Sequence, residues 1–370
     1  MLGNGLMLLV SSVASLLLLE AVLMVSGRYE GVIHGTPSNT TIWTRPRNAV
    51  EYAQHPDLKR MIANVYDADG VRNHSSVPAS KRRRIYGFFG DSFTENRAVA
   101  DEFTFTTILD RLAPGISVVN YGVAGFGVDQ AYLQYKRFAH HDIERVFYVF
   151  CGNDFRNLYE TGLFALDAEG DAAFVGVRRN RVAEFLGGFR VTYLLIELSF
   201  RVRSLGRNGT VNEDVAAAYL ESRFNGADHR ERLHDEYGDS MRRKLLSRDA
   251  SERRKVEPTR ELFRAVLMKW RDELRGSGIP FHVIVLPRAS DSAVARVLLE
   301  GLELDVLYLV DSLGSASYSD YRFATDAHWN EAGNLFAAVE ISRLFPRPLA
   351  PDDPRLAALR AEVAAFYRAE

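Results

Sequence analysis

The fold is decided by residues 85–92, which read IYGFFGDS. Ile85–Phe89 is a short, continuous apolar run, typical of a strand that is buried on both faces. The run ends in Gly90, Asp91 and Ser92, so a tight turn with a serine hydroxyl follows the strand directly. These eight residues predict the first strand of a sheet whose polar chemistry begins where that strand ends.

Outward from this strand, apolar runs alternate with amphipathic segments. We expect strands at residues 85–89, 116–121, 145–150, 281–286 and 306–310. We expect helices at residues 104–112, 128–139, 261–275 and 330–344. This alternation predicts a parallel sheet that is covered by helices on both faces.

The amino-acid composition excludes several classes of protein. The 370 residues are 47% hydrophobic and 25% charged, as expected of a globular chain. Lys and Arg together number 46 against 48 Asp and Glu, so no strong positive field exists to bind nucleic acid. Cys151 is the single cysteine, which excludes an intrachain disulfide and a multi-cysteine metal site. We expect no metal and no other cofactor.

The N-terminus carries a long apolar run. Leu6–Ser26 has only four serines and Glu20 among otherwise apolar residues, and as a helix it would be about 31 Å long. No Lys or Arg precedes it and no clean small-residue cleavage site follows, so we expect an uncleaved single-pass membrane anchor. A cleaved signal peptide and a buried soluble helix are the alternatives. Glu20 is expected either to lie near the interface, hydrated or neutral, or to have a polar partner within the membrane, such as a second copy of the helix or another membrane protein.

The patterns of apolar and polar residues divide the chain into segments. Leu163–Val177 is expected to form a hairpin around Glu169, Gly170 and Asp171. The segments we expect are an anchor (1–27), a stem (28–83), a core (84–154 and 259–346), an inserted cap (155–258) and a C-terminal tail (347–370).

Four polar blocks follow expected strands or precede the last expected helix. They are residues 90–94 (GDSFT), 120–125 (NYGVAG), 151–154 (CGND) and 326–330 (DAHWN). Because ligands bind beyond the carboxyl ends of parallel strands, these blocks are expected to converge at one edge of the sheet.

Together the blocks hold the groups needed for acyl transfer. A serine hydroxyl is a weak nucleophile that needs a base, and His328 is the natural one for Ser92. Asp326 is the nearest carboxylate to orient the imidazole, with Asp320 as a substitute. An oxyanion needs preorganised hydrogen-bond donors, which the amides of Ser92 and Gly125 and the side chain of Asn153 are expected to supply.

These blocks resemble the SGNH/GDSL hydrolase superfamily, whose core is a flavodoxin-like sheet. The resemblance covers residues 84–345 apart from the insertion. It implies that Ser92 is the nucleophile, that His328 and Asp326 are the base and acid, and that Asn153 is an oxyanion donor. It also implies that Gly125 is the oxyanion glycine, with Gly122 as the second choice.

Two departures from the family pattern concern the third and last blocks. Cys151 stands where the family usually has glycine. The family's last block is commonly Asp-x-x-His, which would place the acid at Thr325, whereas this chain has Asp326 two residues before His328. The form Asp-x-His-Trp-Asn is similar to that of envelope polysaccharide O-acetylation enzymes of the same fold.

The expected function is therefore a membrane-anchored serine esterase or O-acyltransferase. The resemblance implies a small acyl group, most simply acetyl, on a carbohydrate of the cell envelope, and a catalytic body on the periplasmic side of the inner membrane. One alternative is a lipase or thioesterase that acts on longer acyl chains. The other is a non-catalytic subunit of a membrane complex that keeps the fold.

Overall fold

The computed structural model describes residues 2–25, 36–38, 40–72, 75, 77–177, 240–350 and 353–368. The chain divides into two compact units, and each is considered by itself. The first comprises residues 1–35 and 178–237, and the second comprises residues 36–177 and 238–370. All four polar blocks belong to the second unit.

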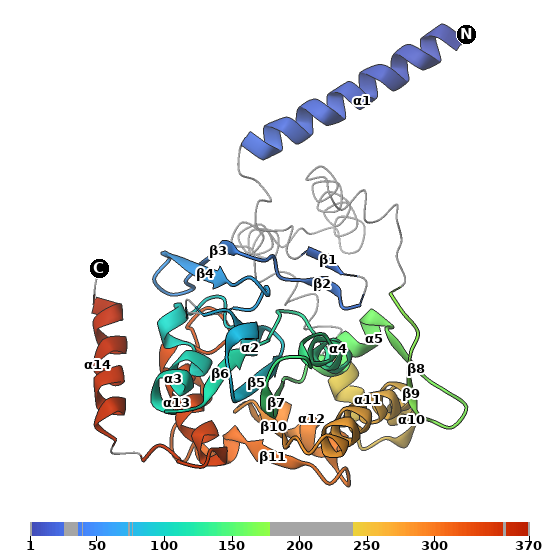
Figure 1. Ribbon diagram of the computed structural model, residues 1–370. Coiled ribbons are helices and arrows are strands. Elements are labelled where there is room, and N and C mark those ends of the chain that lie inside the picture. The colour runs from blue at the N-terminus through green and yellow to red at the C-terminus, as the bar shows by residue number, and fades with distance from the viewer. Residues whose placement is uncertain are drawn as a thin grey trace. The chain divides into compact units, whose positions relative to one another are not determined.

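The second unit is built on a parallel sheet of five strands (Figure 1). The strands lie side by side in the order β6 (Ser117–Asn120), β5 (Ile85–Gly90), β7 (Ile143–Phe150), β10 (Phe281–Val285) and β11 (Asp305–Tyr308). Numbered along the chain, this order is 2-1-3-4-5, that of a doubly wound, flavodoxin-like sheet. The direction of winding reverses between β5 and β7, so the sheet has its switch point where Ser92 follows β5.

Helices cover both faces of the sheet. Successive residues of a strand point to opposite faces, so neighbouring residues pack against different helices. Phe89 and Tyr148 belong to one apolar cluster, which includes residues of α4 (Val128–Phe138), α11 (Glu257–Gly276) and α12 (Ala289–Leu299). The residues next to them in the strands, Phe88 and Phe147, belong to a second cluster with α3 (Phe105–Leu112) and α13 (Glu331–Ile341). The predicted three-layer α/β arrangement is thus confirmed.

All five expected strands and all four expected helices are present, with ends shifted by up to four residues. Several described helices of the second unit were not foreseen, and two of them, each at least eight residues long, lie between β7 and β11 along the chain. The first is α12, whose pattern is short and only weakly amphipathic. The second is α5 (Asp154–Thr161), which follows directly on the third polar block.

The segment expected to be a stem, residues 28–83, contains regular structure in its described part that the sequence did not predict. Residues 36–66 form two antiparallel hairpins, β1 (Thr36–Ser38) with β2 (Ile42–Thr44) and β3 (Ala49–Gln54) with β4 (Met61–Tyr66). A bridge between Arg72 and Asn120 then joins this segment to β6. The strands are short and half-exposed, so their apolar period is too weak to read from the sequence.

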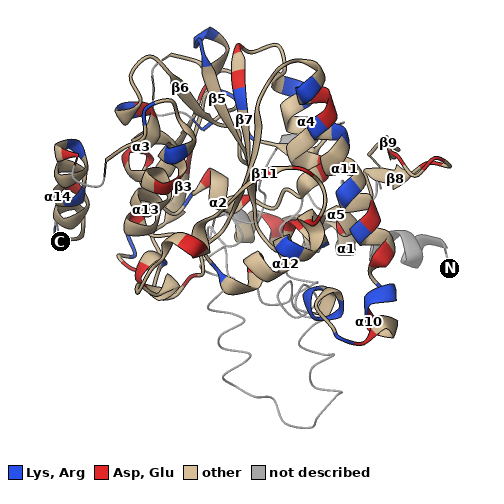
Figure 2. Cartoon of the chain, turned by 90° about the horizontal axis from the view of Figure 1, so that it is seen from below, with Lys and Arg blue, Asp and Glu red and all other residues tan. Residues whose placement is uncertain are grey.

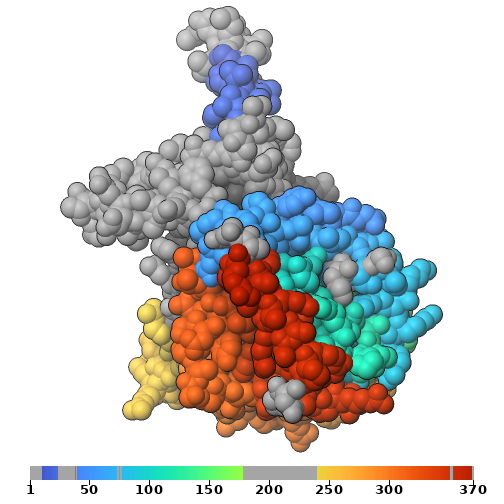
Figure 3. All heavy atoms as spheres, turned by 90° about the vertical axis from the view of Figure 1, so that its left-hand side faces the viewer, coloured from blue at the N-terminus to red at the C-terminus, as the bar shows by residue number. Residues whose placement is uncertain are grey.

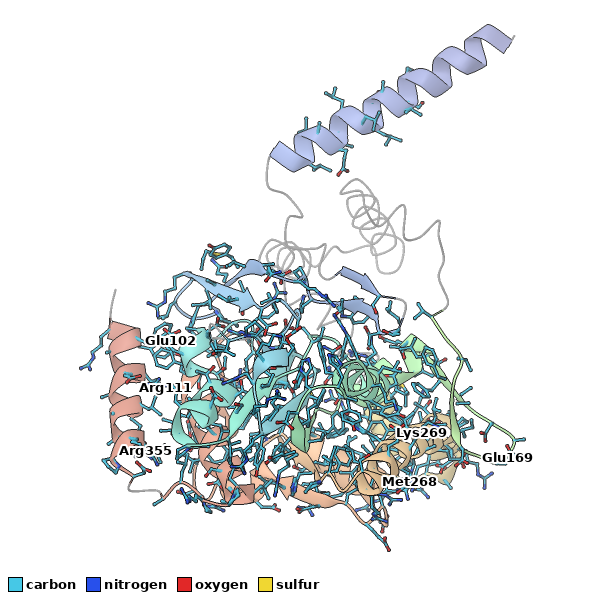
Figure 4. All side chains as sticks on the ribbon, viewed as in Figure 1. Glu102, Arg111, Glu169, Met268, Lys269 and Arg355 are labelled. Carbon is cyan, nitrogen blue, oxygen red and sulfur yellow. The ribbon has the colours of Figure 1, made fainter. Side chains whose placement is uncertain are left out.

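The insertion is described only at its two ends. The expected hairpin is confirmed, with β8 (Phe164–Leu166) antiparallel to β9 (Ala172–Phe174), and Glu169 lies at its exposed tip (Figure 4). A helix at 240–245 and α10 (Ala250–Arg254) precede α11. Residues 178–239, which make up most of the expected cap, lie outside the described residues.

The expected C-terminal tail contains a further helix, α14 (Pro354–Arg368), which packs along the body as an outer ridge (Figure 3). Leu356 and Leu359 of α14 are buried against the cluster that holds α3 and α13. Arg111 and Arg355 lie where α14 meets α3 (Figure 4), and the Arg355 guanidinium donates to the carbonyl of Leu112 at 3.1 Å.

Acidic and basic residues are interspersed over the outer helices of the body (Figure 2), in keeping with a net charge of −2. In the other unit, the apolar N-terminal run forms α1 (Leu2–Val25), so its helical character is confirmed. Among the described residues, no helix combines the length and apolarity that crossing a membrane requires.

Candidate active site

Ser92 is the first residue of α2 (Ser92–Glu95), a single helical turn that follows β5 directly (Figure 1). Asp91 caps this turn, because its Oδ1 accepts the Phe93 N–H at 2.9 Å. Ser92 itself is half-buried, whereas the three residues after it are buried. The serine hydroxyl is therefore held on a rigid element and still reachable from solvent.

Ser92, His328 and Asp326 form a continuous chain of hydrogen bonds. Ser92 Oγ lies 2.7 Å from His328 Nε2, and His328 Nδ1 lies 2.6 Å from Asp326 Oδ1. These are the distances at which an imidazole accepts a proton from a hydroxyl while a carboxylate holds its other nitrogen. The structure thus brings together the three residues that the sequence indicated.

The short Asp-x-His spacing still lets the Asp326 carboxylate reach the His328 ring, because the carboxylate also bonds to the backbone of His328. Asp326 Oδ1 accepts the backbone N–H of His328 at 2.7 Å as well as its ring nitrogen. An aspartate commonly bonds to the backbone two residues onward, so the backbone bond places the carboxylate beside the ring of that residue. Thr325, at the family's usual acid position, instead directs its hydroxyl to the carbonyl of Pro56 at 3.4 Å.

Asp326 is charged at neutral pH. Burial raises the pKa of its carboxyl, but the neighbouring His328 and its hydrogen bonds lower the pKa to about 2. Asp320, the substitute considered for the orienting acid, has another role, because its Oδ2 accepts the Ser317 N–H at 2.9 Å in a capping box. The imidazole is therefore oriented by Asp326.

Aromatic packing fixes the plane of the imidazole. The ring of Phe93 stacks on His328 with centroids 4.6 Å apart, and Trp329 meets Phe93 edge-on at 5.6 Å. Trp329 is fully buried, which confirms that it is a packing residue. The base is consequently held by a carboxylate at its edge and by a ring on its face.

Two backbone N–H groups are available as oxyanion donors. Neither the Ser92 N–H nor the Gly125 N–H is taken up by an acceptor among the described residues. Gly125 has φ +81°, a conformation that glycine adopts without strain. Gly122, the second choice, is excluded because its N–H donates to Asn120 Oδ1 at 3.0 Å.

Gly122 has a packing role instead. A Cβ at this position would lie 2.5 Å from Thr94 Cβ and 2.7 Å from the Glu95 nitrogen. The chain therefore passes so close to α2 that no side chain fits. This close approach holds the 122–125 loop against the helix that carries Ser92.

Asn153 also reaches the site. Its Nδ2 donates to Asp91 Oδ2 at 3.1 Å, and because a carboxamide nitrogen carries two hydrogens, the second can serve an oxyanion. Asp91 was not singled out from the sequence beyond its place in Gly-Asp-Ser. It both caps the nucleophile's turn and holds the third donor, and burial raises the pKa of its carboxyl.

The third block keeps its turn although Cys151 replaces the family's glycine. Cys151 is buried, as expected of a small packing residue, and Arg288 Nη2 lies 3.0 Å from its Sγ. Asp291 accepts the Gly152 N–H at 3.1 Å and pairs with Arg288. Arg288 and Asp291 were missed from the sequence because they follow β10, far from this block along the chain.

The described part of the chain contains no group of three or more His, Cys, Asp or Glu side chains that is placed to hold a metal ion. Compared with protein-family models and with curated proteins, the sequence matches none.

Proposed function

We propose that this protein is a serine ester hydrolase or O-acyltransferase of the SGNH type. One observation carries the proposal: Ser92 Oγ lies 2.7 Å from His328 Nε2, while Asp326 holds the opposite ring nitrogen at 2.6 Å. The free N–H groups of Ser92 and Gly125 and the spare hydrogen on Asn153 Nδ2 add support, because acyl transfer needs donors where negative charge develops.

The first half of the proposed reaction acylates the serine. His328 Nε2 takes the hydroxyl proton as Ser92 Oγ attacks the ester carbonyl, and the carbonyl oxygen becomes an oxyanion held by the donors. Asp326 stays ionised and stabilises the imidazolium. The intermediate then collapses, the ester's C–O bond breaks, and His328 returns its proton to the leaving alcohol.

The second half regenerates the serine. Water or a second alcohol gives its proton to His328 Nε2 and attacks the acyl carbon, and the bond to Ser92 Oγ then breaks with the proton returned to that oxygen. Water gives hydrolysis and an alcohol gives O-acyl transfer. Both outcomes use the same residues, so the site geometry alone supports the two equally.

The proposed substrate is a small acyl ester, most simply acetyl, of an envelope carbohydrate. Its support is the similarity of the Asp326–Asn330 block to that of polysaccharide O-acetylation enzymes, which is an analogy. The 2.7 Å contact between Ser92 and His328 weighs against a non-catalytic subunit. An apolar groove within residues 155–258 would favour the alternative of a lipase or thioesterase, and residues 178–239 of this insertion lie outside the described residues.

The proposed reaction is tested with a fluorophosphonate probe and a series of p-nitrophenyl esters. The wild type should be labelled, and Ser92→Ala should abolish labelling and lower kcat/KM by roughly 10³-fold or more. His328→Ala should have a loss of similar size because the pair acts as a unit. A preference for acetyl over octanoyl esters would support the small-acyl reading, and undiminished turnover by Ser92→Ala would refute the serine mechanism.

We also propose that the segment Leu6–Ser26 anchors the protein in the inner membrane with the catalytic body outside the cytoplasm. The support is the apolar run in the sequence. Protease added to spheroplasts should degrade the body and spare cytoplasmic markers. A body that is protected until lysis would contradict this topology. Crosslinking beside Glu20, compared between wild type and Glu20→Leu, tests for a membrane protein partner.

A further inference from the structure

Ala124, the residue before Gly125, is held through both of its backbone polar groups by residues outside the four blocks. The Ala124 N–H donates to Glu95 Oε2 at 2.6 Å, and the Ala124 carbonyl accepts from Trp43 Nε1 at 3.4 Å. We propose that Glu95 and Trp43 are positioning residues that aim the Gly125 N–H at the oxyanion. This inference rests on the proposed acyl-transfer function, and it makes the N-terminal hairpins part of the working site.

Glu95 fixes the peptide before Ala124, and peptide planarity converts the Trp43 contact into an orientation of the Gly125 N–H. The Ala124 carbonyl and the Gly125 N–H belong to one planar trans peptide and point in opposite directions. A donor that holds the carbonyl oxygen therefore also sets where the N–H points. Trp43 supplies that donor from β2.

The indole of Trp43 also limits how the loop can relax. A Cβ on Gly125 would lie 3.4 Å from Trp43 Cζ2, so the indole lies where a side chain at this position would touch it. Trp43 is itself held by an edge-on contact with Phe126, with ring centroids 5.7 Å apart. On the other side, the Gly125 carbonyl accepts from Asn157 Nδ2 at 3.2 Å.

Glu95 connects the loop to the nucleophile. It lies three residues after Ser92 in α2, and its carboxylate is fully buried. Oε2 accepts from Arg45 Nη2 at 2.6 Å in addition to the Ala124 N–H, and Oε1 accepts from the Tyr66 hydroxyl at 2.6 Å. A buried carboxylate that accepts from three donors, one of them charged, is held in a single orientation. Serine and oxyanion loop are thereby fixed to the same helical turn.

The alternative is that this cluster only stabilises the attachment of the hairpins. The two interpretations predict different effects of a substitution on kcat and KM. A residue that only stabilises the fold changes the fraction of folded protein and leaves the turnover of each folded site unchanged. A residue that aims an oxyanion donor lowers kcat with little effect on KM, because the donor acts mainly in the transition state.

The test compares Glu95→Gln, Trp43→Phe and the control Glu51→Gln. Gln keeps the size of Glu95 but leaves one acceptor oxygen in place of two, and Phe keeps an aromatic ring at Trp43 without its N–H. Glu51 pairs with Arg45 and Arg97 in the same cluster but makes no hydrogen bond to the 122–125 loop among the described residues. The control therefore alters the cluster's charge without touching the loop.

Kinetics are measured per active site, titrated with the fluorophosphonate, alongside the inhibition constant of an acyl trifluoromethyl ketone, which forms a tetrahedral oxyanion on serine. We expect kcat to fall about 10- to 100-fold in Glu95→Gln and about 3- to 10-fold in Trp43→Phe, against the 10²–10³-fold known for loss of a whole donor. KM should change less than about 3-fold, and ketone affinity should fall in parallel with kcat. Glu51→Gln should match the wild type.

Each outcome either supports or overturns the positioning role of Glu95 and Trp43. Parallel losses of kcat and ketone affinity at unchanged KM support the inference. A folded Glu95→Gln or Trp43→Phe with wild-type kcat and ketone affinity overturns it. If Glu95→Gln does not fold, Trp43→Phe alone decides by the same criteria. Full activity in Ser92→Ala would instead defeat the proposed function, which separates the two failures.

Discussion

At the scale of single residues, the site is ordered by three carboxylates with different environments. Asp326 orients the His328 ring, Asp91 caps the turn that carries Ser92 and holds Asn153, and Glu95 holds the 122–125 loop. Burial raises the pKa of each carboxyl. At Asp326 and Glu95 the neighbouring positive groups and hydrogen bonds outweigh it, so their pKa is lowered to about 2. At Asp91 burial prevails.

Asp326→Asn tests the orienting role. Asparagine can present an N–H instead of an acceptor to His328 Nδ1, which favours the wrong tautomer, so we expect kcat to fall by roughly 10²- to 10⁴-fold with little change in KM. Asp320→Asn is the matched control, because Asp320 caps a 3₁₀ turn and is expected to stay within about 2-fold of wild type. Ester turnover at pH 7 to 8 measures both. Equal activities in the two variants would remove Asp326 from the mechanism.

Glu95 predicts a pH dependence of stability. Burial raises the pKa of its carboxyl, but Arg45, Arg97 and the hydrogen bonds from Arg45 and Tyr66 lower it from 4.5 to about 2. A lowered pKa stabilises the folded state fully above about pH 4.5, and this contribution, of order 3 kcal/mol, is lost as the pH falls toward 2. Urea unfolding from pH 7 to pH 3 should therefore show a shallower loss of stability in Glu95→Gln than in wild type. Coincident curves for the two proteins would contradict this account.

At the scale of secondary-structure elements, the site depends on how closely β5, α2 and the loop after β6 approach one another. β5 ends at Gly90 and α2 begins two residues later, at Ser92. The 122–125 loop, which follows β6, packs on α2 with no space for a side chain at Gly122. These elements meet at the switch point of the sheet, where the connections leave β5 and β7 on opposite sides. The donors and the nucleophile come from different strands but share one rim.

Gly122→Ala tests this close approach. The added methyl would clash with Thr94 and the Glu95 backbone, so we expect a loss of about 1–3 kcal/mol in unfolding free energy and a larger proportional loss of turnover. Gly276→Ala is the control, because nothing lies within 4 Å of its Cβ and it ends α11, where alanine favours the helix. Thermal unfolding and ester turnover are measured together. A Gly122→Ala protein as stable and active as Gly276→Ala would show that the loop does not press on α2.

At the scale of the whole molecule, the unit that carries the candidate active site begins at residue 36 rather than at the first strand of the sheet. Trp43 and Arg45, from the segment expected to be a stem, contact the loop and the helix that form the site. His55 Nε2 lies 3.2 Å from the buried Glu331 at the start of α13, and the Tyr367 hydroxyl of α14 donates to the same carboxylate at 2.5 Å. Both ends of the second unit are thus tied to the core.

Two truncations separate these roles. Removal of residues 1–35 should leave a folded protein that the fluorophosphonate labels, because the described contacts among Ser92, His328, Asp326 and the 122–125 loop join residues of the second unit. Removal of residues 1–48 should lower labelling at least 10-fold, because Trp43 and Arg45 are lost and the loop is released. Labelling rates and circular dichroism of the two proteins are compared directly. Wild-type labelling after removal of residues 1–48 would show that the N-terminal segment is dispensable.

Local sequence was sufficient to predict the sheet's strands and to indicate Ser92 and His328, which the structure places within hydrogen-bond distance. The donor roles of Asn153 and Gly125 stay predictions. Strand and helix periods and the glycines of turns depend on neighbouring residues, which is why they can be read directly. Tertiary structure alone decided between Asp326 and Asp320, excluded Gly122, and placed residues 36–66 on the core. The contacts that settled these points join distant residues, such as Trp43 to Ala124 across 81 positions and Arg45 to Glu95 across 50. Such pairs leave no local pattern, because only the folded chain brings them together.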